Sequence, residues 1–251
     1  MIRLTHIGGP TTLIEVGGWR LLTDPTFDPP GARYAFGWGG ASRKLTGPAV
    51  AADALGALDA VLLTHDHHGD NLDVAGRALL PRAGVVITTV AGAARVGGTG
   101  LAPWATTTLE APGRTALEIT ATPCRHGPPG FHFVVGDVIG FALRWDGGAC
   151  WITGDTVLYG GVRAAAERVD ADVLLLHLGA VRFGVTGPLH YTLTARDAVT
   201  LCDIAKPRLV VPVHYEGWKH FSQDRADVER AFAGTPHDVR WLTPGEPTEL
   251  R

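Results

Sequence analysis

The stretch "LLTHDHHGDNLD", residues 62–73, decides the fold of this chain. It follows an apolar run and packs three histidines and three aspartates into the nine positions from 65 to 73. Imidazoles and carboxylates at this density are costly in a core unless they find partners, and a solvated surface has no need of them. Because both are ligands of zinc, iron and manganese, the stretch predicts a metal site.

Three further stretches share one arrangement, in which an apolar strand ends on a candidate ligand. "ATPCRHG" contains His126, "CWITGD" ends on Asp155, and "LVVPVHY" carries His214. Loops at strand ends are where a rigid scaffold presents functional side chains. His65 and His67 are two positions apart and would share one face of an extended segment. We therefore expect these five side chains to converge.

The other histidines are isolated in the sequence, and each is expected to be a hydrogen-bonded or surface residue. They are His6, His132, His177, His190, His220 and His237.

Composition indicates an ordinary globular protein. The 251 residues are 45% hydrophobic and 19% charged, with a formal net charge of -3. We therefore expect no nucleic-acid partner and no attraction to an acidic membrane. No apolar run reaches the roughly 20 residues of a membrane span. The three cysteines, Cys124, Cys150 and Cys202, have no framework spacing, and the opening residues do not read as a signal peptide. A reducing cytoplasm is the expected compartment.

The order of elements predicts one domain, residues 1–251, with two sheets and outer helices. Strands are expected at 2–7, 11–16, 19–24, 58–65, 84–89, 104–110, 115–123, 131–136, 138–145, 148–155, 171–179, 207–215 and 237–243. Helices are expected after Asn71, at 162–169, from a cap at Thr192 or Thr194, and from a cap at Ser222. Residues 25–48 show no period, so they form either a self-packed surface loop or a flap over the site.

The quoted stretch, followed by "RHG", "TGDT" and "PVHYEGW", resembles the metallo-β-lactamase fold superfamily of metallohydrolases. The opening "THIGGPTTLIEVGGWRLLTDP" is similar to the branch of ascorbate-6-phosphate lactonase and N-acylphosphatidylethanolamine phospholipase D. The resemblance runs from Thr5 to about Trp218. It implies an α/β fold, a four-layer αββα sandwich of two mixed β-sheets with helices on the outer faces. It also implies one or two Zn²⁺ per chain, with Mn²⁺ or Fe²⁺ as alternatives.

The resemblance implies a set of ligands. The first metal would be held by His65, His67 and His126, Asp155 would bridge, and His214 would bind the second metal. The family pattern H-x-H-x-D-H requires Asp at position 69 and His at position 70.

This chain departs from that pattern, because Gly69 and Asp70 stand there. An extra residue in the turn would give Asp70 the aspartate's role and put Asn71 in the place of the last histidine. Three outcomes follow. Asp70, Asp155 and His214 suffice for a second metal, or His68 completes that site, or only one metal binds.

Three other aspartates have supporting roles in this interpretation. Asp66 is expected to be a surface carboxylate or to support a ligand, Asp73 to serve the first turn of the next helix, and Asp24 to orient a metal-bound histidine.

The function implied is a metal-dependent hydrolase. A metal-bound hydroxide would attack an ester, lactone or phosphodiester bond of a small substrate, with Asp70 and Asp155 as the catalytic carboxylates. Tyr215 or Lys219 would stabilise the leaving group. The alternative is a non-catalytic metal-binding or sensing protein of the same fold with one metal retained.

An anionic substrate is a further expectation, and it comes from basic residues near the motifs. They are Arg33, Arg43, Lys44, Arg125 and Arg182. The sequence does not define an oligomeric state.

Overall fold

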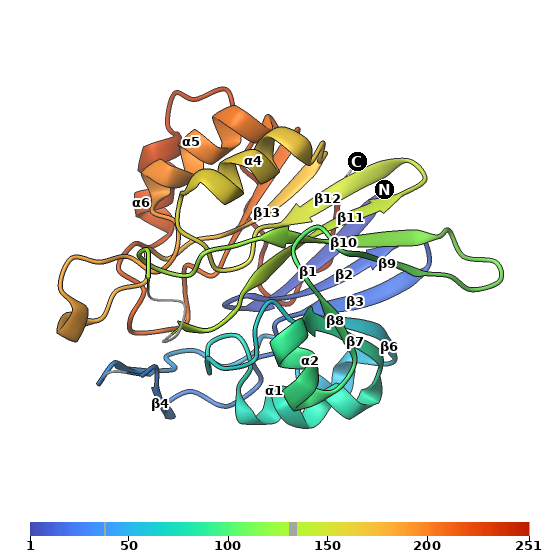
Figure 1. Ribbon diagram of the computed structural model, residues 1–251, viewed down its shortest axis with the longest axis horizontal. Coiled ribbons are helices and arrows are strands. Elements are labelled where there is room, and N and C mark those ends of the chain that lie inside the picture. Colours follow the sequence, from blue (N-terminus) through green and yellow to red (C-terminus); the bar gives the residue numbers. More distant parts are fainter. Residues whose placement is uncertain (38, 131–134, 251) are drawn as a thin grey trace.

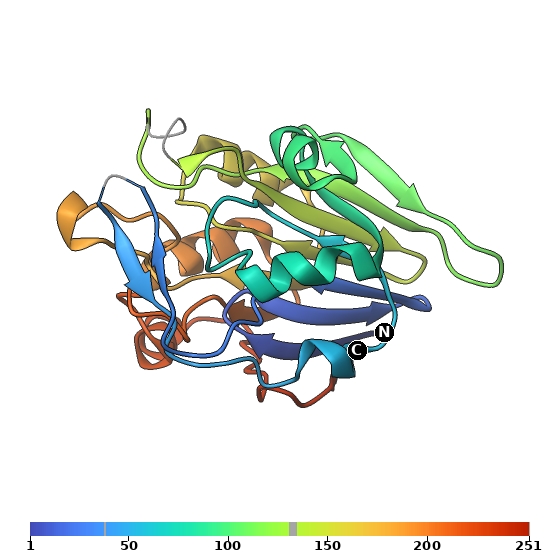
Figure 2. The ribbon, with the colours of Figure 1, turned by 90° about the horizontal axis from the view of Figure 1, so that it is seen from below.

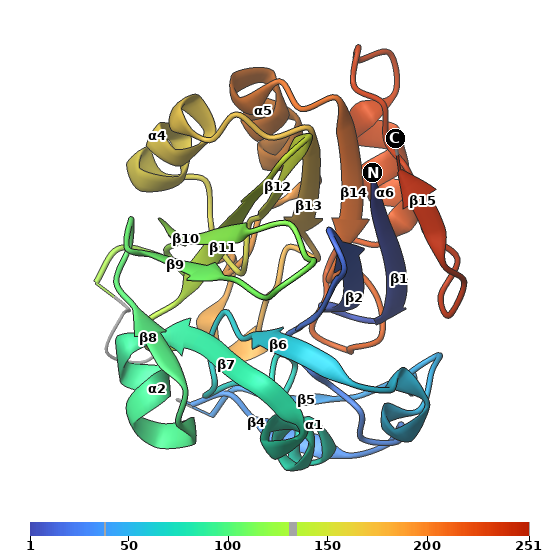
Figure 3. The same cartoon turned by 90° about the vertical axis from the view of Figure 1, so that its right-hand side faces the viewer.

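The computed structural model describes residues 1–37, 39–130 and 135–250. Two sheets lie face to face, with α4, α5 and α6 outside one and α1 and α2 outside the other (Figures 1 and 3). The expected αββα sandwich of two mixed sheets is therefore confirmed. Among the described residues, no helix is both long and apolar enough to cross a membrane.

Seven strands form the first sheet, in the order β15-β1-β2-β3-β6-β7-β8. Their bounds are β1 (Ile2–Gly8), β2 (Thr11–Val16), β3 (Trp19–Thr23), β6 (Leu58–Leu62), β7 (Ala83–Thr89), β8 (Thr99–Leu101) and β15 (Thr248–Leu250). Pairing is antiparallel from β15 to β3 and parallel from β3 to β8.

Six strands form the second sheet, in the order β14-β13-β12-β11-β10-β9. Their bounds are β9 (Thr106–Leu109), β10 (Leu117–Pro123), β11 (Ile139–Trp145), β12 (Gly148–Ile152), β13 (Val173–His177) and β14 (Leu209–Val213). The pairs from β9 to β12 are antiparallel, and β12, β13 and β14 are parallel. Carboxyl ends of those three parallel strands therefore meet at one edge.

Five α-helices and three 3-10 turns complete the described chain. They are α1 (Val74–Leu79), α2 (Val90–Val96), α4 (Gly160–Arg168), α5 (Ala195–Ala205), α6 (Arg225–Phe232), η1 (Ala52–Leu55), η2 (Leu80–Arg82) and η3 (Gly184–Thr186).

Strand periodicity explains the layers, because successive side chains point to opposite faces of a sheet. In β13, Val173 and Leu175 enter the core between the sheets, whereas Leu174 and Leu176 pack under the helices. β6 divides in the same way, with Leu62 facing the other sheet and Val61 facing the helix side. A strand buried on both faces reads as a continuous apolar run, which is how these segments appear in the sequence.

Several boundaries differ from the sequence-based expectation. The expected strand at 237–243 is wrong: this segment makes a single β-bridge, from Val239 to Val210 beside β14. The last strand is β15, which pairs with β1 instead. Asp224, not Ser222, caps α6, since its carboxylate accepts from Asp227 N in a capping box. Residues 131–134 of the expected strand at 131–136 lie outside the described residues.

Two expected caps are confirmed. Thr194 caps α5 in a capping box with Asp197. Asp73 caps α1, where its side chain accepts from Gly76 N.

Residues 25–48 contain a hairpin that the sequence did not predict, β4 (Arg33–Ala35) paired with β5 (Ala41–Arg43) (Figure 2). The ring of Phe36, between the two strands, lies 5.5 Å from that of His68 and 4.8 Å from that of His220. The hairpin therefore covers the histidine-rich stretch, and we call it the flap.

A buried ion pair ties the flap to the metal-binding stretch. Lys44 Nζ lies 2.8 Å from Asp73 Oδ2, and both side chains are nearly inaccessible to solvent. The Asp73 carboxylate also accepts from the backbone N–H groups of Phe27 and Asp28. One side chain thus anchors the start of the long loop, the end of the flap and the start of α1.

We predict that Asp73→Ala lowers the free energy of unfolding by about 3 to 5 kcal/mol, because it leaves the Lys44 ammonium buried without its partner. Denaturant unfolding measures the loss. The control is Asp53→Ala, which removes a solvent-exposed ion pair with Arg82 and should leave stability unchanged. Equal stability of the two variants would contradict the anchoring role.

Candidate metal centre

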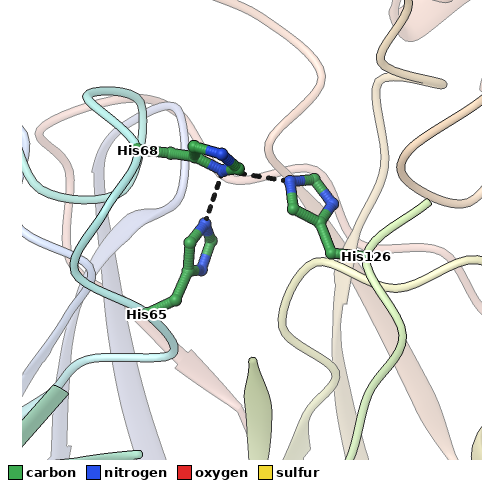
Figure 4. A group of neighbouring side chains, drawn as sticks. All are labelled: His65, His68 and His126. Carbon is green, nitrogen blue, oxygen red and sulfur yellow. Dashed lines mark hydrogen bonds between the residues drawn. The ribbon is translucent and has the colours of Figure 1, made fainter. Parts of the chain in front are cut away.

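Three histidines form the first group of candidate ligands. His65 follows β6, His68 lies three residues further, and His126 follows β10. The His68 Nδ1 atom is 3.2 Å from His65 Nε2 and 3.1 Å from His126 Nε2 (Figure 4). For zinc bonds of about 2.0 to 2.1 Å, tetrahedral geometry places ligand atoms about 3.3 Å apart. The three nitrogens therefore have the spacing of ligands around one ion.

This group differs from the expected ligand set at one position. His68 stands where His67 was expected. The His67 Nε2 atom instead contacts the carbonyl oxygen of Val135, and its ring lies 4.5 Å from the His68 ring. His67 therefore borders the group with its Nε2 engaged, while its Nδ1 is buried without a hydrogen-bond partner among the described residues and lies 3.9 Å from Asp66 Oδ1.

The fold of the turn accounts for the position of His68. The N–H groups of Asn71 and Leu72 both donate to the carbonyl oxygen of His68, so the chain folds back at His68. Gly69 makes room for the flap, because a Cβ there would lie 2.4 Å from Tyr34 Cδ1. The tight turn brings residues three apart, His65 and His68, to the same ion position.

The second group contains Asp70, Asp155 and His214. The His214 Nε2 atom lies 3.5 Å from Asp155 Oδ2 and 3.6 Å from Asp70 Oδ2. These separations are long for hydrogen bonds and suit ligands that share a cation. His214 has a φ of +57°, a left-handed conformation that is uncommon outside glycine and clusters at functional sites.

Unsatisfied buried atoms supply the test of whether a metal fits. Both oxygens of Asp155, Oδ1 of Asp70, Oδ1 of Asn71 and Nε2 of His214 are buried and have no hydrogen-bond partner among the described residues. Buried polar groups in native proteins are almost always paired. A divalent cation would satisfy these atoms, so the residues present fit a metal.

In two of the candidate ligand rings the opposite nitrogen is also held as a metal ligand requires. Nδ1 of His126 contacts the carbonyl oxygen of Tyr191 at 2.7 Å, and Nδ1 of His214 contacts that of Leu178 at 3.2 Å. Such an acceptor fixes the tautomer and leaves Nε2 free for the metal.

Asp24 supports His65 through an intermediate residue. Its Oδ1 accepts from the backbone N–H and the hydroxyl of Thr64, at 2.7 and 2.9 Å. The same hydroxyl lies 3.0 Å from His65 Nδ1. The relay holds the His65 ring with Nε2 toward the group.

Electrostatics differ between the two groups. Burial and the neighbouring imidazoles hold the pKa of His65 well below its ordinary value, and burial lowers the pKa of His126 to about 4. Both rings are thus neutral at neutral pH, the form that coordinates a metal. In the second group, burial opposes protonation of His214, but Asp155 and Asp70 outweigh it and raise its pKa to about 9.

Two histidines that the sequence left among the isolated ones lie beside the second group. Nε2 of His220 is 2.8 Å from Asp70 Oδ2, and its Nδ1 is 2.5 Å from the Ser42 hydroxyl. His177 is fully buried at the end of β13, with its Nε2 3.5 Å from Asp24 Oδ2. The strand-end signal that found Asp155 and His214 applies equally to His177, whereas nothing local marks His220.

Other expected residues lie elsewhere. Tyr215 packs in the core under the helices, with its ring 5.2 Å from that of Trp241. Asp66 is buried and forms a two-pronged ion pair with Arg95 at 2.7 and 2.5 Å. Lys219 lines a pocket next to the flap.

The fold and the two ligand groups define a protein of the metallo-β-lactamase fold class. The Beta-lactamase superfamily domain matches residues 19–215, and the chain belongs to this superfamily.

Several similar proteins and solved structures of the same fold are also hydrolases by name. A metal-dependent hydrolase of Pyrococcus furiosus is 26% identical over 263 residues, covering all of both chains, and another of Pelotomaculum thermopropionicum is 31% identical over 140 residues, covering 53% of this chain and 58% of its own. An isothiocyanate hydrolase from Delia radicum gut bacteria superposes with a TM-score of 0.82 at 22% identity, covering 99% of this chain and 98% of its own. For a metallo hydrolase from Ignicoccus hospitalis the TM-score is 0.68 at 23% identity, with 100% and 99% covered.

We predict that Thr64→Val weakens metal binding by about 10- to 100-fold, because it removes the hydroxyl that links Asp24 to His65. Competition with a chromogenic chelator measures the affinity. Thr88→Val is the matched control, since it removes a buried hydroxyl that has no partner among the described residues. An unchanged affinity in Thr64→Val would refute the relay.

Proposed function

We propose that this protein is a metal-dependent hydrolase with two metals per chain, acting on an ester, lactone or phosphodiester bond. The observation that carries the proposal is the pair of adjacent, fully buried ligand groups, one of three imidazoles and one of two carboxylates and an imidazole. A site that only stabilises the fold needs a single closed set of ligands. Two groups side by side match sites that clamp a substrate oxygen.

The first metal would be held by His65, His68 and His126, and the second by Asp70, Asp155 and His214, with the Asn71 side-chain oxygen directed to the second site. Zinc suits this set of ligands, and manganese and iron are alternatives. When bound, the metals would lower the pKa of a water molecule and polarise the bond to be cleaved.

The residues of the chain would position the reactants. Asp70 is fixed by His220 on Oδ2, which leaves Oδ1 free to hold a water molecule or the metal. Asp155 has both oxygens free and would join the two groups. Phe36 and the flap would exclude solvent from the His68 side, and water exclusion strengthens each electrostatic contact in the site.

Placement in the branch of ascorbate-6-phosphate lactonase and N-acylphosphatidylethanolamine phospholipase D remains part of this proposal, as do a small-molecule substrate and a cytoplasmic location. Support comes from the motif order and from the similar metal-dependent hydrolases. Isothiocyanates join the substrate panel, because a similar solved structure is an isothiocyanate hydrolase.

A second candidate function is metal sensing with one metal retained. The observation in its favour is Asn71, which stands where the superfamily has a histidine and leaves the second group with three strong ligands. Metal content and turnover separate the two functions.

We predict that His68→Ala lowers metal content by about one ion per chain and lowers turnover by more than about 100-fold, since it removes a ligand and not merely its support. His67→Ala is the matched control and should keep its metals, because Nε2 of His67 contacts the Val135 carbonyl oxygen and His67 belongs to neither ligand group. Elemental analysis of the purified variants measures the content. Loss of metal in His67→Ala but not in His68→Ala would support His67 as the ligand, which is the assignment that the sequence resemblance implies.

We also predict turnover of at least one lactone, phosphodiester or isothiocyanate by the metal-loaded protein. Asp155→Ala should abolish it, and chelation should abolish it reversibly, because both remove the groups that activate water. Initial rates with zinc, manganese and iron provide the measurement. One tightly bound metal without turnover of any of these substrates would favour the sensing protein.

A further inference from the structure

A basic pocket lies beside the second ligand group, between the flap and the segment that carries η3. Its volume is about 740 Å³, within the range of small-molecule sites. Its lining includes four cationic side chains, and no aspartate or glutamate among the described residues lines it. The four are Arg33, Arg43, Arg182 and Lys219.

These cations lack the usual partners. No salt bridge between described residues involves any of the four. Two other basic residues that the sequence grouped with them are engaged elsewhere. Lys44 is paired with Asp73, and Arg125 lies over the ring of Tyr159. The pocket therefore concentrates unneutralised positive charge in a chain of net charge -3.

Backbone contacts bring together the segments that carry these residues, whose side chains are exposed to solvent. Lys219 N donates to the carbonyl oxygen of Arg43 at 3.0 Å, and Arg182 N donates to that of His220 at 3.0 Å. Arg33 and Arg43 are direct partners across the β4–β5 hairpin. Like charges directly opposite each other destabilise a hairpin, so this pairing costs stability unless an anion lies between the two guanidinium groups.

The inner wall of the pocket leads to the metal centre. Ser42 and His220 both line it, and both are buried. The His220 ring stacks on Phe183, with centroids 5.2 Å apart and planes at 12°, and it contacts Asp70. A molecule in the pocket is therefore one imidazole away from a ligand of the second group.

We infer that this pocket binds the phosphate group of a phosphorylated small-molecule substrate, and the inference rests on the hydrolase function proposed above. Several guanidinium groups around one space match the several acceptor oxygens of a phosphate, to which arginine donates two parallel hydrogen bonds. One carboxylate would leave most of the four cations unneutralised. A pocket of this volume also favours a small molecule over a nucleic-acid strand, which needs an extended groove.

Titration of the full-length, metal-loaded protein with inorganic phosphate at low ionic strength tests the inference. Phosphate affinity is expected to fall about tenfold in Arg43→Gln and in Arg182→Gln, and about a hundredfold in the double variant. Arg43→Lys should retain part of the affinity because it retains the charge. Arg196→Gln on the exposed face of α5 is the control, and melting temperature and metal content are measured for every variant.

The outcomes separate the pocket from the hydrolase function. Unchanged phosphate affinity in a folded, fully metal-loaded double variant would overturn the inference and assign phosphate to the metals alone. Tighter binding of acetate than of phosphate would also overturn the inference. So would tighter binding of a single-stranded oligonucleotide than of phosphate, if the arginine substitutions abolish the oligonucleotide binding. Phosphate binding that depends on the arginines without any turnover keeps the pocket and removes the hydrolase. Turnover that is unchanged in Arg43→Gln and in Arg182→Gln would keep the hydrolase function and remove the pocket from it.

Discussion

The structure depends on one constraint, which is that the carboxylates and imidazoles buried at the strand ends of the two sheets must find partners. Asp155 is completely buried and neither of its oxygens has a hydrogen-bond partner among the described residues; its neighbour is the His214 ring, whose Nε2 lies 3.5 Å from Oδ2. Removing such a group from water costs several kcal/mol when nothing replaces the lost contacts. The side chains that carry this desolvation cost lie at strand ends of both sheets. The stability of the sandwich therefore depends on how the candidate metal centre is satisfied.

The flap packs directly on the stretch that carries the candidate ligands. Its Tyr34 ring occupies the space that a side chain at position 69 would need, and Phe36 packs on His68. Lys44 closes the segment by burying its charge on Asp73. The turn at residues 65–72 and the β4–β5 hairpin are therefore packed against each other, and a change in one requires a change in the other.

Sequence reasoning reached the fold and most of the candidate ligands for a physical reason. Parallel strands buried on both faces read as continuous apolar runs, and the polar residue that ends each run marks the shared edge. Asp155 and His214 are found in this way. The place of His68 beside His65 and His126 could not be predicted, because it depends on how the turn after His65 folds. His220 could not be found either, since only the three-dimensional fold brings residue 220 next to residue 70.

The Ser42–His220–Asp70 chain of contacts has a consequence for affinity. One imidazole touches the pocket wall through Nδ1 and a carboxylate of the second group through Nε2. A molecule in the pocket that moved this ring would move Asp70 as well. Under the two proposals, binding at the two places would be thermodynamically linked, and linkage is reciprocal: the factor by which the occupant changed the affinity for a metal at Asp70 would be the factor by which that metal changed the affinity for the occupant.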